Sequence, residues 1–243
     1  MKKWKKLLLT VLIGIVVVII GGIAYVKTQT YAPTEAAQQV TEQAKEGKDW
    51  LYFPSEDKSK PIIIFYPGAL VDPGSYSPWA QTLAKAGYPV YLLKMPLDLA
   101  ILAPNRGEQV LSQQPKRDFV LGGHSLGGVM ASRFAKEHSD RLVGVFFLAS
   151  YPDEKGSLAD KKLPVLSLTG EKDEVLNRDA YQKAKEDLPK DTNYQEIVGG
   201  NHGGFGAYGA QKGDGKSDIS DQNEQVAQRL ITCCLLYTSD AAD

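Results

Sequence analysis

Cysteine is nearly missing from this chain of 243 residues, because its two copies, Cys233 and Cys234, both lie close to the C-terminus. The rest of the sequence therefore offers no disulfide, no thiolate zinc site and no cysteine nucleophile. Histidine occurs only three times, so a mechanism that needs an imidazole base has three candidates. Positive charge is not in excess, since 28 basic and 29 acidic residues leave a net charge of −1. Because nucleic-acid binding usually needs an excess of basic residues, we expect no nucleic-acid partner. Phosphate-loop and dinucleotide-binding motifs are missing too, and we expect neither a cofactor nor a metal ion.

Long apolar runs are confined to the N-terminus, where residues 7–26 carry no charge. A helix of about 20 apolar residues spans the hydrocarbon core of a bilayer. Lysines at positions 2, 3, 5 and 6 precede the run, which predicts a cytoplasmic N-terminus with the rest of the chain outside the cell. We therefore expect residues 1–27 to form a single-pass membrane anchor. The alternatives are a cleaved signal peptide, which would release a secreted protein, and a buried soluble helix.

The remaining chain divides by composition into three parts. Residues 28–48 are rich in Thr, Gln, Ala, Glu and Lys, which predicts a polar tether or a short surface helix. Residues 49–231 have the length of one folded domain. Residues 232–243 break the helical pattern before them and are similar to translated sequencing-adapter sequence, so we expect a non-native tail.

Short apolar runs within residues 49–231 are continuous rather than alternating, as in strands that are buried on both faces. Segments with a helical pattern separate them, which predicts an α/β fold with a mostly parallel central sheet flanked by helices. The predicted strands cover residues 50–53, 62–66, 90–93, 119–121, 142–149, 165–168 and 194–198, and the predicted helices cover about residues 76–86, 98–112, 126–138, 176–188 and 224–231.

Gly123, Ser125 and Gly127 form a G-x-S-x-G motif between a predicted strand and a predicted helix. Glycines are needed where a tight strand-to-helix turn leaves no room for side chains, and such a turn raises the serine hydroxyl above the sheet edge. The positive end of the following helix faces the same point. The pattern favours Ser125 as a nucleophile; the alternative is a serine that only caps the helix.

A serine nucleophile needs a base, and the sequence favours His202 for this role. His202 follows a predicted strand in a glycine-rich loop, so it is expected at the same sheet edge as the serine. His124 adjoins the serine and is expected to point away from it, and His138 ends a predicted helix. The alternative for His202 is a loop histidine exposed to solvent.

The turn after the predicted strand at 165–168 supplies an acid that could orient the base. Asp173 is favoured there over Glu171 and Glu174, which we expect to be solvated. The backbone N–H groups of Ala69 and Leu126 are predicted to form an oxyanion hole. The alternative for the segment around Ala69 is an ordinary Pro-Gly turn.

Residues 66–73, 122–128 and 199–202 resemble the α/β-hydrolase superfamily, and in particular its small, cap-less branch related to dienelactone hydrolases. The resemblance spans about residues 50–231, and a chain order of serine, acid and histidine is the one expected for that superfamily. Dienelactone hydrolases use a cysteine nucleophile where this chain has Ser125, so their substrate is not carried over. Pro67 stands where many relatives have histidine, but only backbone chemistry is needed there.

The resemblance and the motifs together predict a membrane-anchored, extracytoplasmic serine hydrolase. Its partner would be a small-molecule carboxylic ester, cleaved by a Ser-His-Asp triad through an acyl-enzyme. The alternatives are a non-catalytic surface binding protein of the same fold and an acyltransferase that uses the same triad. Residues 213–218 have a superficial likeness to a calcium loop, but we expect a solvated turn. The sequence indicates neither the acyl group nor the oligomeric state.

Overall fold

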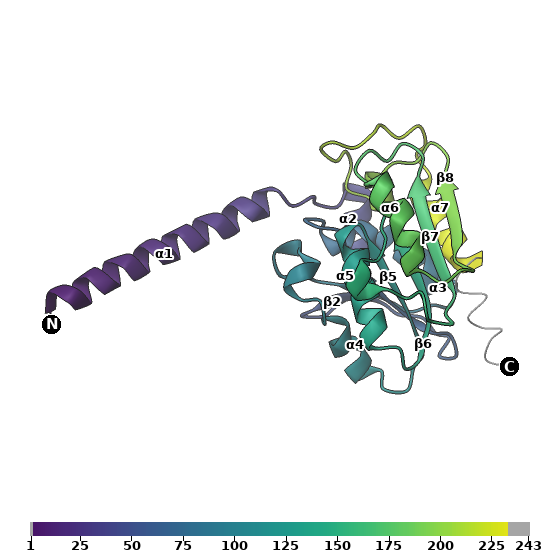
Figure 1. Ribbon diagram of the computed structural model, residues 1–243, viewed down its shortest axis with the longest axis horizontal. Helices are drawn as coiled ribbons and strands as arrows, with labels where there is room; N and C mark the ends of the chain where they lie inside the picture. The colour runs from purple at the N-terminus through teal and green to yellow at the C-terminus, as the bar shows by residue number, and fades with distance from the viewer. Residues whose placement is uncertain (1, 233–243) are drawn as a thin grey trace. The chain divides into compact units, whose positions relative to one another are not determined.

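The computed structural model describes residues 2–232 and has two compact units, one ending at Thr30 and one beginning at Tyr31. Cys233, Cys234 and the rest of the predicted tail after Thr232 lie outside the described residues. The first unit contains helix α1 (Lys2–Thr28), drawn in purple in Figure 1. The most apolar part of this helix has a mean hydropathy of 3.0, and none of it is buried. Helix α1 is thus long and apolar enough to cross a membrane, a property that signal sequences share.

An eight-stranded sheet forms the centre of the second unit, in the order β1-β2-β4-β3-β5-β6-β7-β8. The pairs from β4 to β8 are parallel, whereas β2 pairs antiparallel with both β4 and β1 at one edge. The strands are β1 (Lys45–Glu46), β2 (Trp50–Phe53), β3 (Ile62–Tyr66), β4 (Val90–Leu93), β5 (Phe119–His124), β6 (Leu142–Leu148), β7 (Val165–Gly170) and β8 (Asn193–Ile197). Because parallel strands share a direction, the loops after β3, β5, β7 and β8 all leave the same edge of the sheet.

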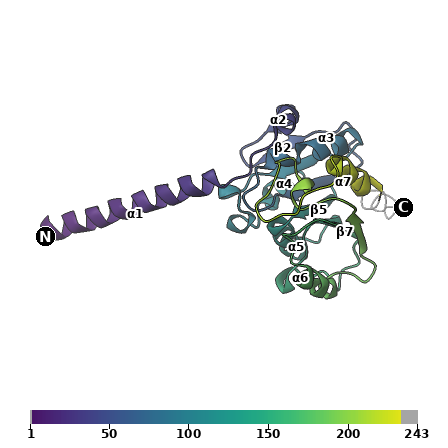
Figure 2. The ribbon, with the colours of Figure 1, turned by 90° about the horizontal axis from the view of Figure 1, so that it is seen from above.

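Helices cover both faces of the sheet, with α2, α3 and α7 on one side and α5 and α6 on the other (Figure 2). The α-helices are α2 (Glu35–Thr41), α3 (Ser77–Lys85), α4 (Gly107–Gln113), α5 (Leu126–Glu137), α6 (Arg178–Lys183) and α7 (Gln222–Leu230). Short 3-10 helices are η1 (Pro73–Tyr76), η2 (Pro96–Asp98), η3 (Ala100–Leu102), η4 (Glu154–Gly156), η5 (Ala184–Asp187) and η6 (Gly203–Phe205). The predicted fold class, a mostly parallel sheet between helices, is confirmed.

Two apolar clusters hold the layers together, one on each face of the sheet. Phe65 of β3 packs in the cluster that contains Trp79 of α3 and Val226 of α7. Ile64, its neighbour in the strand, packs in the cluster that contains Phe134 of α5. Successive side chains of a strand point to opposite faces, so a strand covered on both sides must be apolar throughout. The continuous apolar runs of the sequence follow from this geometry.

The segment predicted as one helix over residues 98–112 is broken in the structure. Leu97 and Asp98 have positive φ values of 54° and 55°, and between Asp98 and Pro104 the described chain forms only the short 3-10 helix η3. A residue before proline is disfavoured in the helical conformation, and helix α4 begins only at Gly107. The prediction was therefore wrong for residues 98–106.

Residues 28–48, expected as a polar tether or a short surface helix, contain helix α2 and strand β1. Ala37 of α2 is fully buried, and Val40 and Ala44 pack against the same cluster as α3. The N–H of Tyr31 donates to the carbonyl of Leu70 at 2.7 Å. Ala37 and Val40 are three residues apart in α2, which is the spacing of one helix face, and α2 packs through that face.

Candidate active site

Ser125 lies in the turn between β5 and α5 with a φ of 52° and a ψ of −127°. This backbone conformation is rare for a residue with a side chain and costs on the order of 1–3 kcal/mol. Close backbone packing explains the flanking glycines. A Cβ on Gly123 would lie 2.5 Å from the carbonyl carbon of Gly127, and one on Gly127 would lie 2.2 Å from the carbonyl oxygen of Tyr66. The motif therefore forms a sharp strand-to-helix turn with its serine partly exposed.

Ser150, a residue that the sequence did not single out, holds this turn from the end of β6. Its hydroxyl donates to the carbonyl of Ser125 at 2.6 Å, and the N–H of Ser125 donates to the carbonyl of Leu148 at 3.1 Å. Ser150 is buried, so little water competes for its hydrogen bond. These two bonds help to keep the strained backbone of Ser125 in place.

Asp173 and His202 form a buried pair at the carboxyl edge of the sheet. Oδ2 of Asp173 lies 2.9 Å from Nδ1 of His202, and the two residues are 5% and 1% exposed. Oδ1 of Asp173 accepts the N–H groups of Val175 and Leu176 at 2.9 and 2.8 Å. An ionised carboxylate can only accept a hydrogen bond, so Nδ1 of His202 is the donor in such a pair. Loops after two neighbouring strands, β7 and β8, bring this pair together.

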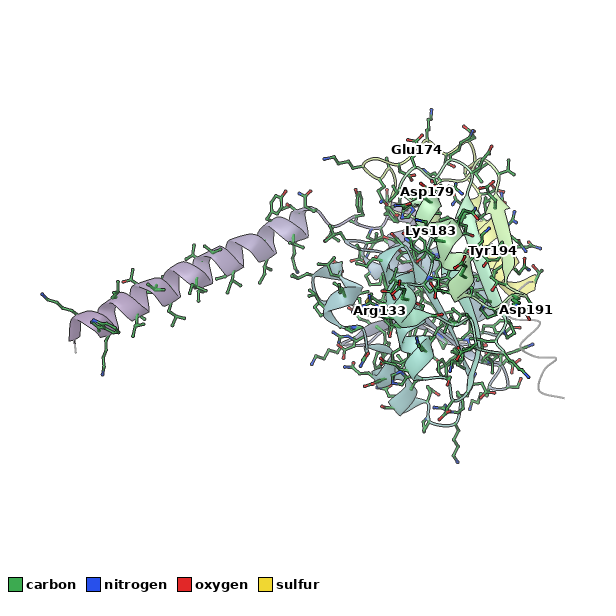
Figure 3. All side chains as sticks on the ribbon, viewed as in Figure 1. Arg133, Glu174, Asp179, Lys183, Asp191 and Tyr194 are labelled. Carbon is green, nitrogen blue, oxygen red and sulfur yellow. The ribbon has the colours of Figure 1, made fainter. Side chains whose placement is uncertain are left out.

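The less favoured candidates lie outside this pair. Glu171 and Glu174 are exposed, and the carboxylate of Glu171 accepts the N–H of Gly199 at 2.8 Å. Figure 3 shows Glu174 among the loops beyond the sheet edge. His138 stands at the far end of α5 from Ser125, where its Nδ1 is 3.1 Å from the carbonyl oxygen of Phe134.

One pocket of about 260 Å³ brings Ser125 and His202 together. Its lining carries no acid, lysine or arginine and consists of Ser125, Leu126, Val129, Ala149, Ser150, Tyr151, Val175, Leu176, Asn177 and His202. Nε2 of His202 has no hydrogen-bond partner among the described residues. Hydrogen bonds between a nucleophile and its base are often longer without substrate and tighten when it binds. A larger hollow of about 560 Å³, lined by residues of β2 and α3, contains none of the triad candidates.

The two backbone N–H groups predicted for an oxyanion hole lie at the ends of neighbouring strands. Leu126 is the first residue of α5, where an N–H has no acceptor within the helix. Ala69 follows β3, whose last residue, Tyr66, pairs with Gly123 of β5. Within residues 2–232, neither N–H donates a hydrogen bond to another residue. Both donors therefore remain available to a ligand at this edge.

His124, for which no role was predicted, packs directly against the candidate base. The ring centroids of His124 and His202 are 4.6 Å apart. The hydroxyl of Tyr76 accepts the N–H of Gly68 at 3.0 Å and lies 2.9 Å from Nδ1 of His124. A hydroxyl that accepts one hydrogen bond still has its own proton, so Tyr76 can donate to Nδ1 of His124, whose Nε2 has no hydrogen-bond partner among the described residues.

Burial, reinforced by the nearby His202 ring, holds the pKa of His124 well below its ordinary value of 6.5. Burial also raises the pKa of Tyr76 above its ordinary value. Both shifts favour the uncharged form of the group in question. His202 therefore has a neutral imidazole behind it at neutral pH.

Comparison with protein families agrees with this geometry. The model of the alpha/beta hydrolase family matches residues 62–226. The chain belongs to the alpha/beta hydrolase family. The matched part of this hydrolase extends from the first residue of β3 into α7 and includes all three triad candidates and both oxyanion candidates. Comparison with curated protein sequences gives no significant match.

Solved structures similar to the hydrolase share its fold at low sequence identity. A candidate lipase from Acinetobacter baumannii AYE is 15% identical with a TM-score of 0.64, and the match covers 85% of this chain and 96% of that one. A monoacylglycerol lipase from Paleococcus ferrophilus is 15% identical with a TM-score of 0.56, over 74% and 95% of the two chains. A dienelactone hydrolase from Anabaena variabilis is 16% identical with a TM-score of 0.57, over 78% and 88%. At these identities the likenesses show a shared fold.

Proposed function

We propose that this alpha/beta hydrolase is a serine hydrolase that cleaves small, uncharged carboxylic esters. The observation that carries the proposal is the buried Asp173–His202 pair, whose free Nε2 borders the same pocket as Ser125. Nucleophile, orienting acid and base follow one another along the chain as Ser125, Asp173 and His202, which is the order expected for an α/β-hydrolase triad.

The first chemical step forms an acyl-enzyme. Oγ of Ser125 attacks the ester carbonyl carbon while Nε2 of His202 accepts the hydroxyl proton. Asp173 keeps the proton on Nδ1 and stabilises the imidazolium that forms. The N–H groups of Ala69 and Leu126 donate to the developing oxyanion. His202 then returns its proton to the leaving alkoxide, and the alcohol departs.

The second step releases the acid. Water attacks the acyl carbon and gives a proton to Nε2 of His202, and the same two N–H groups stabilise the second oxyanion. Collapse of this intermediate breaks the bond to Ser125, whose oxygen regains the proton from His202. In this proposal the acyl group lies against Leu126 and Val129 of the pocket lining in both steps.

The pocket supports an uncharged acyl group of modest size. Half of its lining residues are aliphatic, and none is a lysine or arginine that could pair with a second carboxylate. Burial of such a charge without a partner would be costly. The similar structures named as lipases agree with a neutral ester. The hydroxyl of Tyr151 and the amide of Asn177 are the polar groups that these two lining residues bring to the pocket.

The cellular site of this activity is part of the proposal. Helix α1 is long enough to span a bilayer, and the lysines before its apolar run favour a cytoplasmic N-terminus. We place the second unit outside the cytoplasm, anchored by α1. Extraction of membranes with high salt and then with detergent tests the anchor, because an integral helix is released only by detergent.

Labelling with a fluorophosphonate tests the nucleophile. The full-length protein is expected to react at Ser125, and Ser125→Ala is expected to lose both the label and several orders of magnitude in kcat for p-nitrophenyl esters. Ser112→Ala, on the exposed side of α4, is a matched control that should behave like the wild type. Hydrolysis retained in Ser125→Ala would refute the proposal, and ester formed with an added alcohol instead of acid would indicate acyl transfer.

A further inference from the structure

The loop between η6 and α7 contains a carboxylate that is enclosed by backbone donors. Oδ2 of Asp214 accepts the N–H of Gly203 at 2.8 Å, and its Oδ1 accepts the N–H of His202 at 3.2 Å. Oδ1 also accepts the N–H of Gly215 at 2.8 Å. The expected solvated turn is therefore attached to the loop that carries the candidate base.

The same carboxylate reaches the loop that carries the orienting acid. The N–H of Glu174, next in the chain after Asp173, lies 3.4 Å from Oδ1 of Asp214. One side chain thus joins the backbone beside Asp173 to the backbone of His202. The separation of these two loops sets the length of the Asp173–His202 hydrogen bond, because each functional side chain is short.

Close packing around Gly215 reinforces this connection. The side-chain amide of Asn201 donates to the carbonyl of Gly215 at 2.7 Å. A Cβ on Gly215 would lie 2.0 Å from the carbonyl oxygen of Lys172, so the turn lies directly on the backbone that precedes Asp173. The turn is therefore held between both functional loops rather than projecting into solvent.

A cation site does not explain Asp214. Its two oxygens already accept N–H groups, which repel a cation placed between them. No group of three or more His, Cys, Asp or Glu side chains within the described residues is arranged to hold a metal ion. The contacts of Asp214 instead match the role of a support for neighbouring functional groups.

We propose that Asp214 is a positioning residue that fixes the position of the His202 backbone relative to the turn that carries Asp173. This inference rests on the proposed serine-hydrolase function for its kinetic consequences, but the geometry that it describes is independent of the substrate. Loss of the Asp214 carboxylate would let the two loops separate, lengthen the Nδ1–Oδ2 bond and misplace Nε2 relative to Ser125.

The test compares Asp214→Ala and Asp214→Asn with the wild type, using full-length protein and p-nitrophenyl acetate. Misplacement of a catalytic group by about 1 Å can cost 100-fold, so we expect kcat to fall roughly 10- to 100-fold in Asp214→Ala with KM changed less than about twofold. Asp214→Asn keeps one oxygen acceptor and should be intermediate. Asp218→Asn is the matched control, because Asp218 is exposed in the same loop and its carboxylate pairs only with Lys172 among the described side chains.

Proton NMR reports on the His202–Asp173 hydrogen bond itself, and a general loss of stability does not change that signal while the protein remains folded. The proton that His202 donates to Asp173 should resonate far downfield in the wild type and in Asp218→Asn, and should be shifted or lost in Asp214→Ala at a temperature where the variant is folded. If Asp214→Ala does not fold, both the kinetics and the NMR resonance are measured on Asp214→Asn. Wild-type kcat with an unchanged resonance in the Asp214 variants would overturn the proposal, as would an equal loss in Asp218→Asn. A wild type without esterase activity would refute the proposed function. In that case, an Asp214→Ala resonance equal to that of the wild type would still refute the positioning role by itself.

Discussion

The buried His124 should make the stability of the fold depend on pH in a way that one substitution removes. Its pKa in the folded state is held well below 6.5, whereas the unfolded chain titrates near that value. Below pH 6.5 the unfolded chain therefore binds a proton that the folded protein excludes. The contribution of neutral His124 to stability is complete above this pH and is lost as the pH falls.

The size of the effect follows from the linkage of protons to unfolding. One proton bound only by the unfolded state lowers the free energy of unfolding by up to about 1.4 kcal/mol per pH unit. Between pH 7.5 and 5.5, this term amounts to about 1.4 kcal/mol in total, because the unfolded histidine titrates only partly above pH 6.5. That loss is a sizeable fraction of the 5–15 kcal/mol typical of folded domains.

Urea unfolding of the full-length protein at pH 7.5, 6.5 and 5.5 measures this dependence. His124→Gln removes the titrating group and keeps an oxygen that can accept the Tyr76 hydroxyl proton. Its unfolding free energy should fall less steeply below pH 6.5 than that of the wild type, whatever its stability at pH 7.5. Parallel pH curves for the two proteins would show that the folded state accommodates a proton on His124, and would refute the argument from burial.

Two further substitutions test the site. Asp173→Asn should lower kcat on a p-nitrophenyl ester by on the order of 10³–10⁴-fold with little change in KM, because the amide favours the wrong tautomer of His202. Stopped-flow or steady-state kinetics measure this on a variant whose circular dichroism spectrum matches the wild type. A loss of kcat under tenfold would contradict the role of Asp173. Gly127→Ala should lower the free energy of unfolding by about 1–3 kcal/mol, since its added Cβ would lie 2.2 Å from the Tyr66 carbonyl oxygen. Urea titration measures this free energy. A variant as stable as the wild type would show that the start of helix α5 is free to shift.

Much of the sheet could be predicted from local pattern. Runs such as Ile62–Tyr66 and Val90–Leu93 coincide with β3 and β4, because a strand covered on both faces must be apolar at every position. The helix after Ser125 could be predicted for the same kind of reason, since its apolar residues recur at helical spacing. The broken segment at 98–106 could not, because positive φ values at Leu97 and Asp98 depend on how that loop packs.

The sequence by itself determined which chemistry the chain has available: a serine in a glycine-flanked turn, a histidine in a glycine-rich loop and an acid after a strand. Those choices are local, because spacing and residue type dictate turns and strands over a few positions. Only the tertiary structure decided that Asp173 rather than its neighbours meets His202, that His124 lies behind that ring, and that Asp214 joins the two loops. Each of these contacts links residues from separate loops or strands, and no local pattern encodes a distance that depends on how the whole sheet is assembled.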